Sequence, residues 1–441
     1  MSHTRRDFVE RASVLLAGAG LASTRAGEAL AATQRVAPSD TLNFGVIGVN
    51  GMGWSNLQAH VKIPGVSCTA LCDVDGEVLE RRGAELESLS GSRPVLHRDY
   101  RAMLDDPDID FVIIATPDHW HCLQMVHACE AGKDVYVEKP LANSIAECDI
   151  MTRAAERYDR VVTVGQWQRS NEHWRDAIAY VQEGNVGRVR LVKAWAYMGW
   201  MNSIPVQPDG PAPPHVDYDM WLGPAPDRPF NPNRFHFNFR WFWDYAGGLM
   251  TDWGVHLIDI ALLGMNARAP KSVFSAGGKM AYPDDAAETP DTQQALYEFD
   301  EFSMIWEHGV GISNGPYGRG HGVAFVGNDG TVVVDRSGWE VIPEVDEGRY
   351  KTPALPPRQG QRTGVDPHAV NFVDCIRNRG RPNAPVDSAA NTAVVAHLGN
   401  VAFKVGRKLD WDHDARQFTG DAEANALLRP RYRGPWTLPQ V

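Results

Sequence analysis

The sequence predicts an α/β protein that begins with a doubly wound parallel sheet and continues into a second domain built on another sheet. Short apolar runs alternate with helical stretches from residue 42 to 164, a spacing typical of parallel strands joined by helices. A glycine-rich turn separates the first apolar run from the first helix. Beyond residue 188, alternating apolar and polar residues indicate strands with one packed face.

Length and composition narrow the choice further. The chain has 441 residues, more than one ordinary core holds, which favours two domains. Its formal net charge of −12 argues against a nucleic-acid partner, because a phosphate backbone attracts clustered lysine and arginine. No run of about 20 apolar residues occurs, so we expect no membrane span. The six cysteines form no C-x-x-C pattern, and we expect buried or free thiols.

The first 31 residues have the order of an export signal. Arg5 and Arg6 precede a short apolar segment from residue 12 to 22, and Ala29-Leu30-Ala31 supplies the small residues of an A-x-A cleavage site. The arginine pair predicts export of the folded protein by the twin-arginine route, and therefore a periplasmic location. A basic N-terminus with an incidental arginine pair is the alternative.

The first predicted strand, L-N-F-G-V-I-G at residues 42 to 48, leads into a turn with G-x-x-G-x-G spacing. Glycines permit a tight turn and let the backbone approach a pyrophosphate, which rests on the N-terminus of the next helix. That helix is expected from about residue 54 to 62. We expect these turn residues to contact a dinucleotide: Gly48, Gly51, Met52 and Gly53.

The second predicted strand, V-S-C-T-A-L-C-D at residues 66 to 73, ends in an acid. Asp73 is placed to accept a hydrogen bond from a ribose 2′-hydroxyl, and its charge would repel a 2′-phosphate. The sequence therefore favours NAD over NADP. The alternation continues through helix 75–89, strand 109–115, helix 119–132, strand 134–138, helix 144–157 and strand 161–164.

Two loops follow predicted strands where the ligand crevice of such a sheet opens. They are T-P-D-H-W-H at residues 116 to 121 and E-K-P at residues 138 to 140. Lys139 follows a buried strand, and a partly desolvated lysine can move a proton as a hydride leaves an alcohol. We expect Lys139 to be catalytic and, with Glu138, to lie beside the cofactor.

A second constellation is G-G-L-M-T-D-W-G-V-H-L-I-D-I at residues 247 to 260. The residues after Gly248 are predicted to be helical, so Asp252 and His256 share one face, one turn apart. Histidine suits proton transfer near neutral pH, and the acid can orient or charge it. Asp259 lies three residues further along and can join them. A core histidine with a purely structural role is the alternative.

Together these motifs resemble the Gfo/Idh/MocA oxidoreductase family from about residue 41 to 440. The resemblance is carried by G-V-I-G-V-N-G-M-G, A-T-P-D-H-W-H, Y-V-E-K-P-L and G-G-L-M-T-D-W-G-V-H-L-I-D. It implies a Rossmann domain, then an α/β domain whose mostly antiparallel open sheet covers the substrate and often forms the oligomer interface. It also implies NAD(P)-linked oxidation or reduction of sugars, cyclitols or glycosides.

The resemblance assigns residues and domains as well. The family's lysine, acid and histidine correspond to the catalytic residues expected above, Lys139, Asp252 and His256. Its T-P-x-x-x-H segment, near the cofactor, corresponds to Thr116, Pro117 and His121. We expect a signal peptide at residues 1–31, an NAD-binding Rossmann domain at 41–165 and a substrate domain at 166–441, the latter joining a homodimer or homotetramer.

The remaining candidates lie in the second domain. Strands are predicted at 189–197, 271–277, 292–299, 302–307, 322–327 and 331–335, and a capped amphipathic helix at 366–378. Residues 198 to 240, rich in proline and aromatics, make the chain similar to an exported branch of the family with an extended C-terminal segment. Candidate sugar contacts, for each of which a structural role is equally open, are Arg169, His173, Arg240, Trp243 and Asp259.

These observations predict a periplasmic NAD-dependent oxidoreductase that acts on a ring hydroxyl of a sugar or glycoside, with Lys139 or His256 moving the proton. Because free NAD is scarce outside the cytoplasm, we expect a tightly held cofactor. No H-x-x-x-H or cysteine cluster completes a metal site, so no metal is expected. The alternatives are NAD-assisted glycoside cleavage by oxidation and elimination, and a non-catalytic exported sugar-binding protein.

Overall fold

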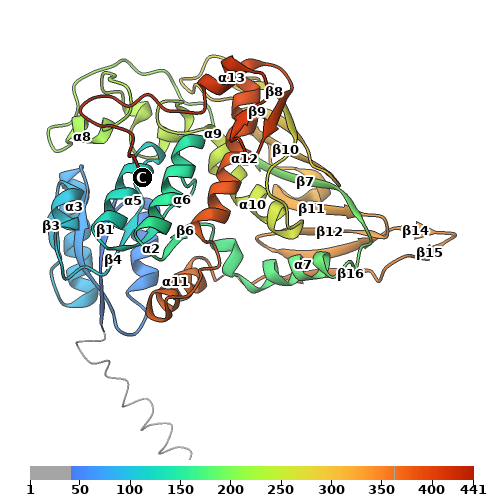
Figure 1. Ribbon diagram of the computed structural model, residues 1–441, viewed down its shortest axis with the longest axis horizontal. Coiled ribbons are helices and arrows are strands. Elements are labelled where there is room, and N and C mark those ends of the chain that lie inside the picture. Colours follow the sequence, from blue (N-terminus) through green and yellow to red (C-terminus); the bar gives the residue numbers. More distant parts are fainter. Residues whose placement is uncertain (1–40, 362) are drawn as a thin grey trace, which may run out of the picture.

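The computed structural model describes residues 41–361 and 363–441. It has an α/β fold in which two sheets lie side by side, with helices between and around them (Figure 1). This confirms the predicted fold class. The predicted signal peptide at residues 1–31 lies outside the described residues.

The N-terminal sheet has six parallel strands in the order β3-β2-β1-β4-β5-β6, the doubly wound order of a Rossmann domain. Helices cover both of its faces, so the central strands are apolar throughout; all four residues of β4 are buried. The strands are β1 (Leu42–Ile47), β2 (Val66–Cys72), β3 (Val95–His97), β4 (Phe111–Ile114), β5 (Asp134–Val137) and β6 (Val162–Val164).

Short polar side chains start several helices around this sheet. Asp75 caps α3 and Ser144 caps α6, each by accepting hydrogen bonds from backbone N–H groups of the first turn. The short elements β3 and α4 have no counterpart in the sequence prediction. The helices are α2 (Gly51–His60), α3 (Gly76–Ser90), α4 (Tyr100–Leu104), α5 (Asp118–Glu130) and α6 (Ile145–Arg157).

The second sheet has ten strands in the order β16-β13-β12-β11-β7-β10-β9-β8-β17-β18. Neighbouring strands are antiparallel except β7 and β10, as the family resemblance implies. A separate hairpin of β14 (Val345–Asp346) and β15 (Arg349–Tyr350) projects from it (Figure 1). The ten strands are β7 (Val189–Met198), β8 (Ser272–Gly278), β9 (Thr292–Glu298), β10 (Ser303–Val310), β11 (His321–Gly327), β12 (Gly330–Asp335), β13 (Gly338–Pro343), β16 (Leu355–Gln359), β17 (Leu409–Asp412) and β18 (Gln417–Phe418).

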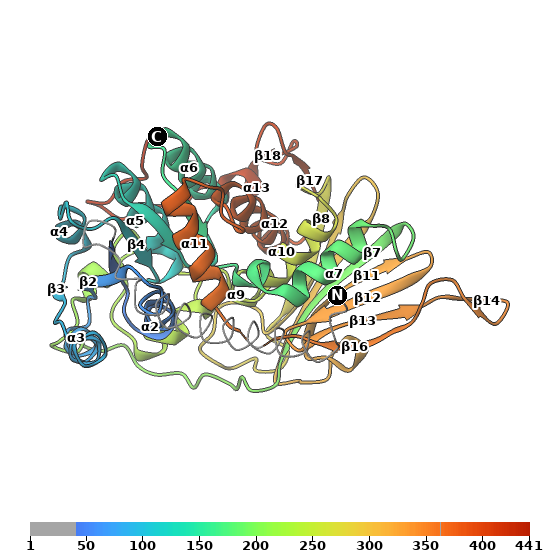
Figure 2. The ribbon, with the colours of Figure 1, turned by 90° about the horizontal axis from the view of Figure 1, so that it is seen from below.

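Helices α7 (Glu172–Gln182) and α10 (Gly254–Gly264) pack on one face of the second sheet, α7 against β12 and β13 and α10 against β7 and β11 (Figure 2). The single helix predicted after Gly248 is interrupted. It consists of α9 (Gly248–Asp252) and α10, which meet at Trp253, and the poor helix former Gly254 follows the break. Asp252 therefore ends one helix and His256 lies in the next.

The C-terminal helices α11 (Asp366–Asn378) and α12 (Val386–Val405) return to the first domain. Phe372 of α11 packs with Phe111 in the Rossmann core, at a ring-centroid distance of 5.4 Å, and α12 runs between α6 and β8. The C-terminal tail folds back over the body of the protein. Trp436 packs on Trp120 with ring centroids 4.9 Å apart.

Three expectations from the sequence concern the cysteines, membrane spans and metal sites. All six cysteines are buried and unpaired, as predicted. In the described ranges, no helix has the length and apolar character needed to cross a bilayer. The same ranges contain no group of three or more His, Cys, Asp or Glu side chains arranged to hold a metal ion.

Candidate active site

The turn between β1 and α2 is shaped to receive a pyrophosphate. Gly48 and Gly51 have positive φ angles of 83° and 47°, which glycine adopts without strain. A Cβ on Gly53 would lie 1.8 Å from the carbonyl oxygen of Gly48, so α2 packs this closely on β1 only with glycine there. Asn50, the N-cap residue of α2, makes no side-chain cap. Gly53 N donates to the carbonyl oxygen of Asn50 at 2.9 Å, and no side-chain cap occupies the other N–H groups of the first turn, which can therefore bind an anion.

Asp73 follows β2, where the sequence places a ribose contact. Its Oδ2 accepts a hydrogen bond from Val49 N at 2.9 Å, and its Oδ1 accepts one from Asp75 N at 3.0 Å. Burial raises the pKa of Asp73, and these two N–H donors oppose the rise. The carboxyl lines the cavity described next and keeps lone pairs for hydroxyl donors.

A cavity of about 380 Å³ runs from this turn to the Lys139 loop. The Rossmann domain forms one wall, with Met52, Thr116 and Pro117 among its lining residues. The other wall comes from residues 198–242, which we call the covering segment; it lies over the Rossmann domain, in light green with α8 (Tyr218–Leu222) in Figure 1. It contributes Met220, Trp221, Phe235, His236, Phe237, Phe239 and Arg240.

The covering segment is tied to the end of β2. Nε2 of His236 lies 3.1 Å from Oδ2 of Asp75. Backbone contacts add to this, since Gly76 N donates to the carbonyl oxygen of His215 at 2.9 Å. The segment therefore closes over the end of the cavity that Asp73 lines.

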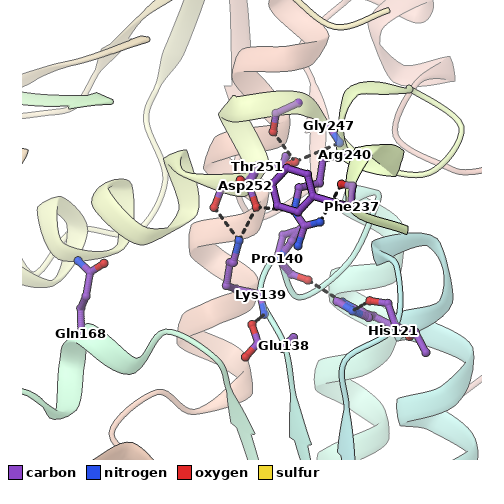
Figure 3. A network of polar contacts seen from close by, with 12 residues as sticks. His121, Glu138, Lys139, Pro140, Gln168, Phe237, Arg240, Gly247, Thr251 and Asp252 are labelled. Atoms are coloured by element: carbon purple, nitrogen blue, oxygen red, sulfur yellow. Dashed lines mark hydrogen bonds and ion pairs between the residues drawn. The ribbon is translucent and has the colours of Figure 1, made fainter. Parts of the chain in front are cut away.

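Lys139 lies at the other end of the cavity, directly after β5 (Figure 3). Its Nζ donates to Oδ1 of Asp252 at 2.5 Å and to the Asp252 carbonyl oxygen at 3.0 Å. Nε of Arg240 donates to the same Oδ1 at 3.1 Å. Burial alone would raise the pKa of Asp252, but the two cations hold it well below its usual range. The Lys139 side chain is 11% exposed, so it is largely desolvated yet open to the cavity.

His121 holds two cavity loops together. Its Nδ1 lies 2.8 Å from the carbonyl oxygen of Pro140 and its Nε2 lies 2.9 Å from that of Thr116. Burial lowers the pKa of His121 to about 4, so the ring is neutral at pH 7. The side chain is absent from the cavity lining, whereas Thr116 and Pro117 belong to it. His121 thus supports the loops expected to contact the cofactor.

Two further carboxyls line the cavity. Burial raises the pKa of Glu138, which accepts a hydrogen bond from Asn56 at 2.8 Å. Burial also raises the pKa of Asp118 to about 8, although Arg240 and Lys139 oppose the rise. Asp118 therefore holds a proton at neutral pH and can donate a hydrogen bond. The sequence prediction missed Asp118, whose signal is the acid in T-P-D-H-W-H.

His256 is buried on α10 beside two indoles. Its ring centroid is 6.3 Å from those of Trp167 and Trp253. Its Nδ1 is buried and finds no hydrogen-bond partner among the described residues. Asp252, expected to orient it, is bonded to Lys139 instead. Burial lowers the pKa of His256 well below its usual value, so the ring is neutral at pH 7 and would hold an accepted proton only weakly. His256 is not among the residues that line the cavity.

The other predicted sugar contacts lie outside this cavity. Arg169 and Asp259 form a buried bidentate pair, with Nε–Oδ2 at 2.7 Å and Nη2–Oδ1 at 2.5 Å. His173 has its Nε2 3.1 Å from the carbonyl oxygen of Asp335, the last residue of β12. Trp243 lines a separate, smaller depression. Of the five predicted contacts, the structure brings Arg240 into this cavity, where it shares Asp252 with Lys139.

Comparisons with known proteins agree with this geometry. A model described as an oxidoreductase family, NAD-binding Rossmann fold, matches residues 42–166. A model of the C-terminal α/β domain of the same family matches residues 190–438. Among curated relatives, a glycosyl hydrolase family 109 protein of Solibacter usitatus is 34% identical over 163 residues, which cover 36% of this chain and 37% of that protein. The chain thus spans little more than a third of the length of such relatives.

Solved structures share the fold at low sequence identity. An aldose-aldose oxidoreductase from Caulobacter crescentus, complexed with glycerol, is 19% identical, with a TM-score of 0.63 over 84% of this chain and 100% of that one. A levoglucosan dehydrogenase in complex with NADH and levoglucosan is 20% identical, with a TM-score of 0.63 over 84% and 99% of the two chains.

Proposed function

Since the chain belongs to the Gfo/Idh/MocA oxidoreductase family, we propose that it is an NAD-dependent oxidoreductase acting on a ring hydroxyl of a sugar or glycoside. One observation gives this proposal its main support. A single cavity joins the uncapped, glycine-rich turn at one end to the Lys139–Asp252–Arg240 cluster at the other. A cofactor and a reacting group can therefore meet in one closed space. The fold shared with the aldose-aldose oxidoreductase and the levoglucosan dehydrogenase supports a sugar substrate.

The residues present fit NAD. The turn from Gly48 to Gly53 would hold the pyrophosphate, and Asp73 would hold the ribose hydroxyls. A carboxylate at this point favours a free 2′-hydroxyl over a 2′-phosphate, which supports NAD rather than NADP. When bound, NAD supplies an acceptor for a hydride from the carbon that bears the hydroxyl, and NADH a donor in the reverse direction.

Lys139 and His256 have different parts in this proposal. Lys139, with its ammonium held by Asp252, donates a hydrogen bond to the reacting oxygen and can protonate a carbonyl in the reductive direction. His256, neutral and with an unpartnered Nδ1, accepts the hydroxyl proton in the oxidative direction. Asp118, protonated at neutral pH, can donate a further hydrogen bond.

A single-turnover assay tests the proposal. The protein with its bound cofactor is mixed with aldoses, polyols and glycosides in turn, and the near-ultraviolet absorbance of reduced nicotinamide is followed. We expect at least one sugar to reduce the cofactor. If sugars bind but none is oxidised or cleaved, the non-catalytic sugar-binding alternative replaces this one.

Glycoside cleavage assisted by NAD is a second candidate. It is supported by the glycosyl hydrolase family 109 relatives, although they match over about a third of their length. In this chemistry, oxidation beside the glycosidic carbon permits elimination of the aglycone, and re-reduction restores the cofactor. Release of free sugar from a chromogenic glycoside without net NADH would favour it; a stoichiometric build-up of NADH without release would exclude it.

The covering segment explains how an exported enzyme could retain its cofactor. Phe235 and Phe237 line the cavity above the Rossmann wall. We expect the double variant Phe235→Ala/Phe237→Ala to release bound NAD about 10- to 100-fold faster, because the two rings together contribute on the order of 1.4–2.7 kcal/mol of apolar contact. The release rate is measured by diluting the NAD-loaded protein and separating free nucleotide by rapid filtration. Tyr350→Ala, which removes an exposed ring from the β14–β15 hairpin, is the control. An unchanged release rate in the double variant would refute this role.

Export by the twin-arginine route is part of the proposal. It is supported by Arg5-Arg6, the apolar run and the A-x-A site in the N-terminal 31 residues. A route that moves folded proteins would carry the cofactor inside the closed cavity. Fractionation of cells that make the full chain should recover it from the periplasm, and recovery solely from the cytoplasm would contradict export.

We also propose a homo-oligomer formed through the second sheet. Phe274, Leu296 and Ile305 are register neighbours on β8, β9 and β10, and all three are exposed. Contiguous exposed apolar side chains of this kind mark interaction surfaces. Leu296→Lys should lower the mass measured by light scattering from oligomer to monomer, whereas Val95→Lys on exposed β3 should not. A monomeric wild type would contradict the proposal.

A further inference from the structure

Two indole rings hold one arginine beside the candidate active site. Arg336 lies in the turn after β12, with its Cζ 4.9 Å from the ring centroid of Trp167 and 4.4 Å from that of Trp253. Trp253 directly follows Asp252 in the chain, and its ring centroid lies 6.3 Å from that of His256. The stacked guanidinium is therefore a neighbour of the residues on which the proposed function depends.

Arg336 lacks the anion that a desolvated guanidinium needs. Within residues 41–361 and 363–441 it forms no ion pair, and its side-chain hydrogen bond is a long one, from Nη2 to Oε1 of Gln168 at 3.4 Å. Its Nε is buried without a partner. Desolvation lowers the pKa of Arg336 to about 10, and the opposing charge is that of Asp252, which is already bonded to Lys139.

The cations around the site outnumber the carboxylate that serves them. Lys139 and Arg240 both bond to Asp252, and among the described residues no carboxylate lies within ion-pair distance of Arg336. Excess charge of one sign in a desolvated site is unfavourable until a counter-ion binds. The cations are Lys139, Arg240 and Arg336.

Neighbouring polar atoms also lack partners. His321 packs against Trp253 with ring centroids 5.0 Å apart, and its Nε2 is buried without a hydrogen bond in the described structure. The same holds for Nδ1 of His256 and Oε1 of Gln166. Buried polar groups in native proteins are normally paired, so a cluster of unpaired ones points to a polar ligand.

We propose that Arg336, clamped between Trp167 and Trp253, binds the carboxylate of an acidic sugar, which makes uronic acids or their glycosides the substrate class. The inference rests on the proposed function and narrows its substrate. The indoles fix the plane of the guanidinium, and its unpartnered Nε–H together with an Nη–H forms the fork that a carboxylate accepts through both oxygens. Binding the anion also neutralises the surplus charge.

Calorimetric titration tests the subsite by binding alone when the bound cofactor is first reduced to NADH, because NADH cannot accept a hydride from a sugar. The probes are D-glucuronate, D-galacturonate and D-mannuronate, each compared with its neutral aldose, and D-glucose 6-phosphate. We expect at least one uronate to bind about tenfold tighter than its neutral partner. Arg336→Gln should weaken the binding of that uronate by about 10- to 100-fold and leave the affinity for the neutral sugar nearly unchanged. Arg336→Lys keeps the positive charge but loses the forked pair of N–H donors, so its affinity for the uronate should lie between those of the wild type and Arg336→Gln.

Arg358→Gln is the matched control. Arg358 also stacks on an indole, with its Cζ 4.9 Å from the ring centroid of Trp339, but it lies exposed on β16. The Arg358→Gln variant should bind the uronate as tightly as the wild-type protein does. The proposal is overturned if no uronate is preferred, if Arg336→Gln does not abolish the preference, or if the phosphate sugar binds tighter than every uronate.

The experiments distinguish failure of the carboxylate subsite from failure of the oxidoreductase proposal. If an Arg336-dependent uronate binds but no sugar ever reduces the cofactor, the subsite stands and the oxidoreductase proposal fails. If a neutral sugar reduces the cofactor while uronates show no preference, the oxidoreductase proposal stands and the subsite fails.

Discussion

Lys139→Met is expected to slow single-turnover reduction of the bound cofactor by about 10²- to 10⁴-fold, the range for loss of a positioned proton donor. The substitution removes the ammonium at the end of the cavity while preserving most of its volume. Asp252 keeps its hydrogen bond from Arg240 at 3.1 Å, so its charge is not left unpaired and the fold should survive. The rate is measured by stopped flow with a sugar that reduces the wild-type protein.

Lys133→Met provides the comparison. Lys133 is also buried, and its Nζ donates to the carbonyl oxygen of Asp106 at 2.6 Å. It precedes β5, whereas Lys139 follows β5, so the two lysines lie at opposite ends of this strand. This variant should reduce its cofactor at the wild-type rate. A Lys139→Met rate close to that of Lys133→Met would remove Lys139 from the chemistry.

Asp259→Ala is expected to lower the free energy of unfolding by about 3–5 kcal/mol, the cost of leaving one member of a buried ion pair without its partner. Asp259 accepts two hydrogen bonds from Arg169, and Thr392 donates a third at 3.0 Å. The side chains of the pair are 5% and 1% exposed, so water cannot replace the lost carboxylate. Urea unfolding with saturating NAD measures the change.

The control is Asp300→Ala, which breaks the exposed pair of Lys271 and Asp300. Exposed ion pairs contribute little, and no measurable change is expected. The experiment also decides between two roles for Asp259. Unchanged stability with a raised KM for sugar would mean that Asp259 contacts substrate, as the sequence suggested, and that the structural role inferred from the Arg169 pair is wrong.

Most of the parallel sheet could be predicted because its strands other than β3 are short apolar runs that alternate with helical stretches. The 20-residue helix α12 could not be predicted, because its own small and apolar residues lie on every face and form no amphipathic stripe. Strand β16 reads L-P-P-R-Q, and its two prolines argue against a strand until the structure shows it at the sheet edge.

The candidate site was predictable where its chemistry lies in local motifs. The glycine turn and Lys139 belong to short patterns that follow predicted strands, and Asp252 belongs to the G-G-L-M-T-D-W-G-V-H pattern. Pairings across the chain were not predictable. Arg169 and Asp259 are 90 residues apart, and no pattern in either segment says that they neutralise each other. The raised pKa of Asp118 likewise depends on burial, which a single sequence does not display.

Retention of NAD beneath the covering segment is tested most directly by recovering the nucleotide. The mature protein is purified from its export compartment and denatured, and the supernatant is assayed for NAD, NADH and their 2′-phosphates. We expect NAD or NADH in near-stoichiometric amount, without the phosphorylated forms. Protein that arrives without nucleotide and rapidly exchanges added labelled NAD would contradict a resident cofactor.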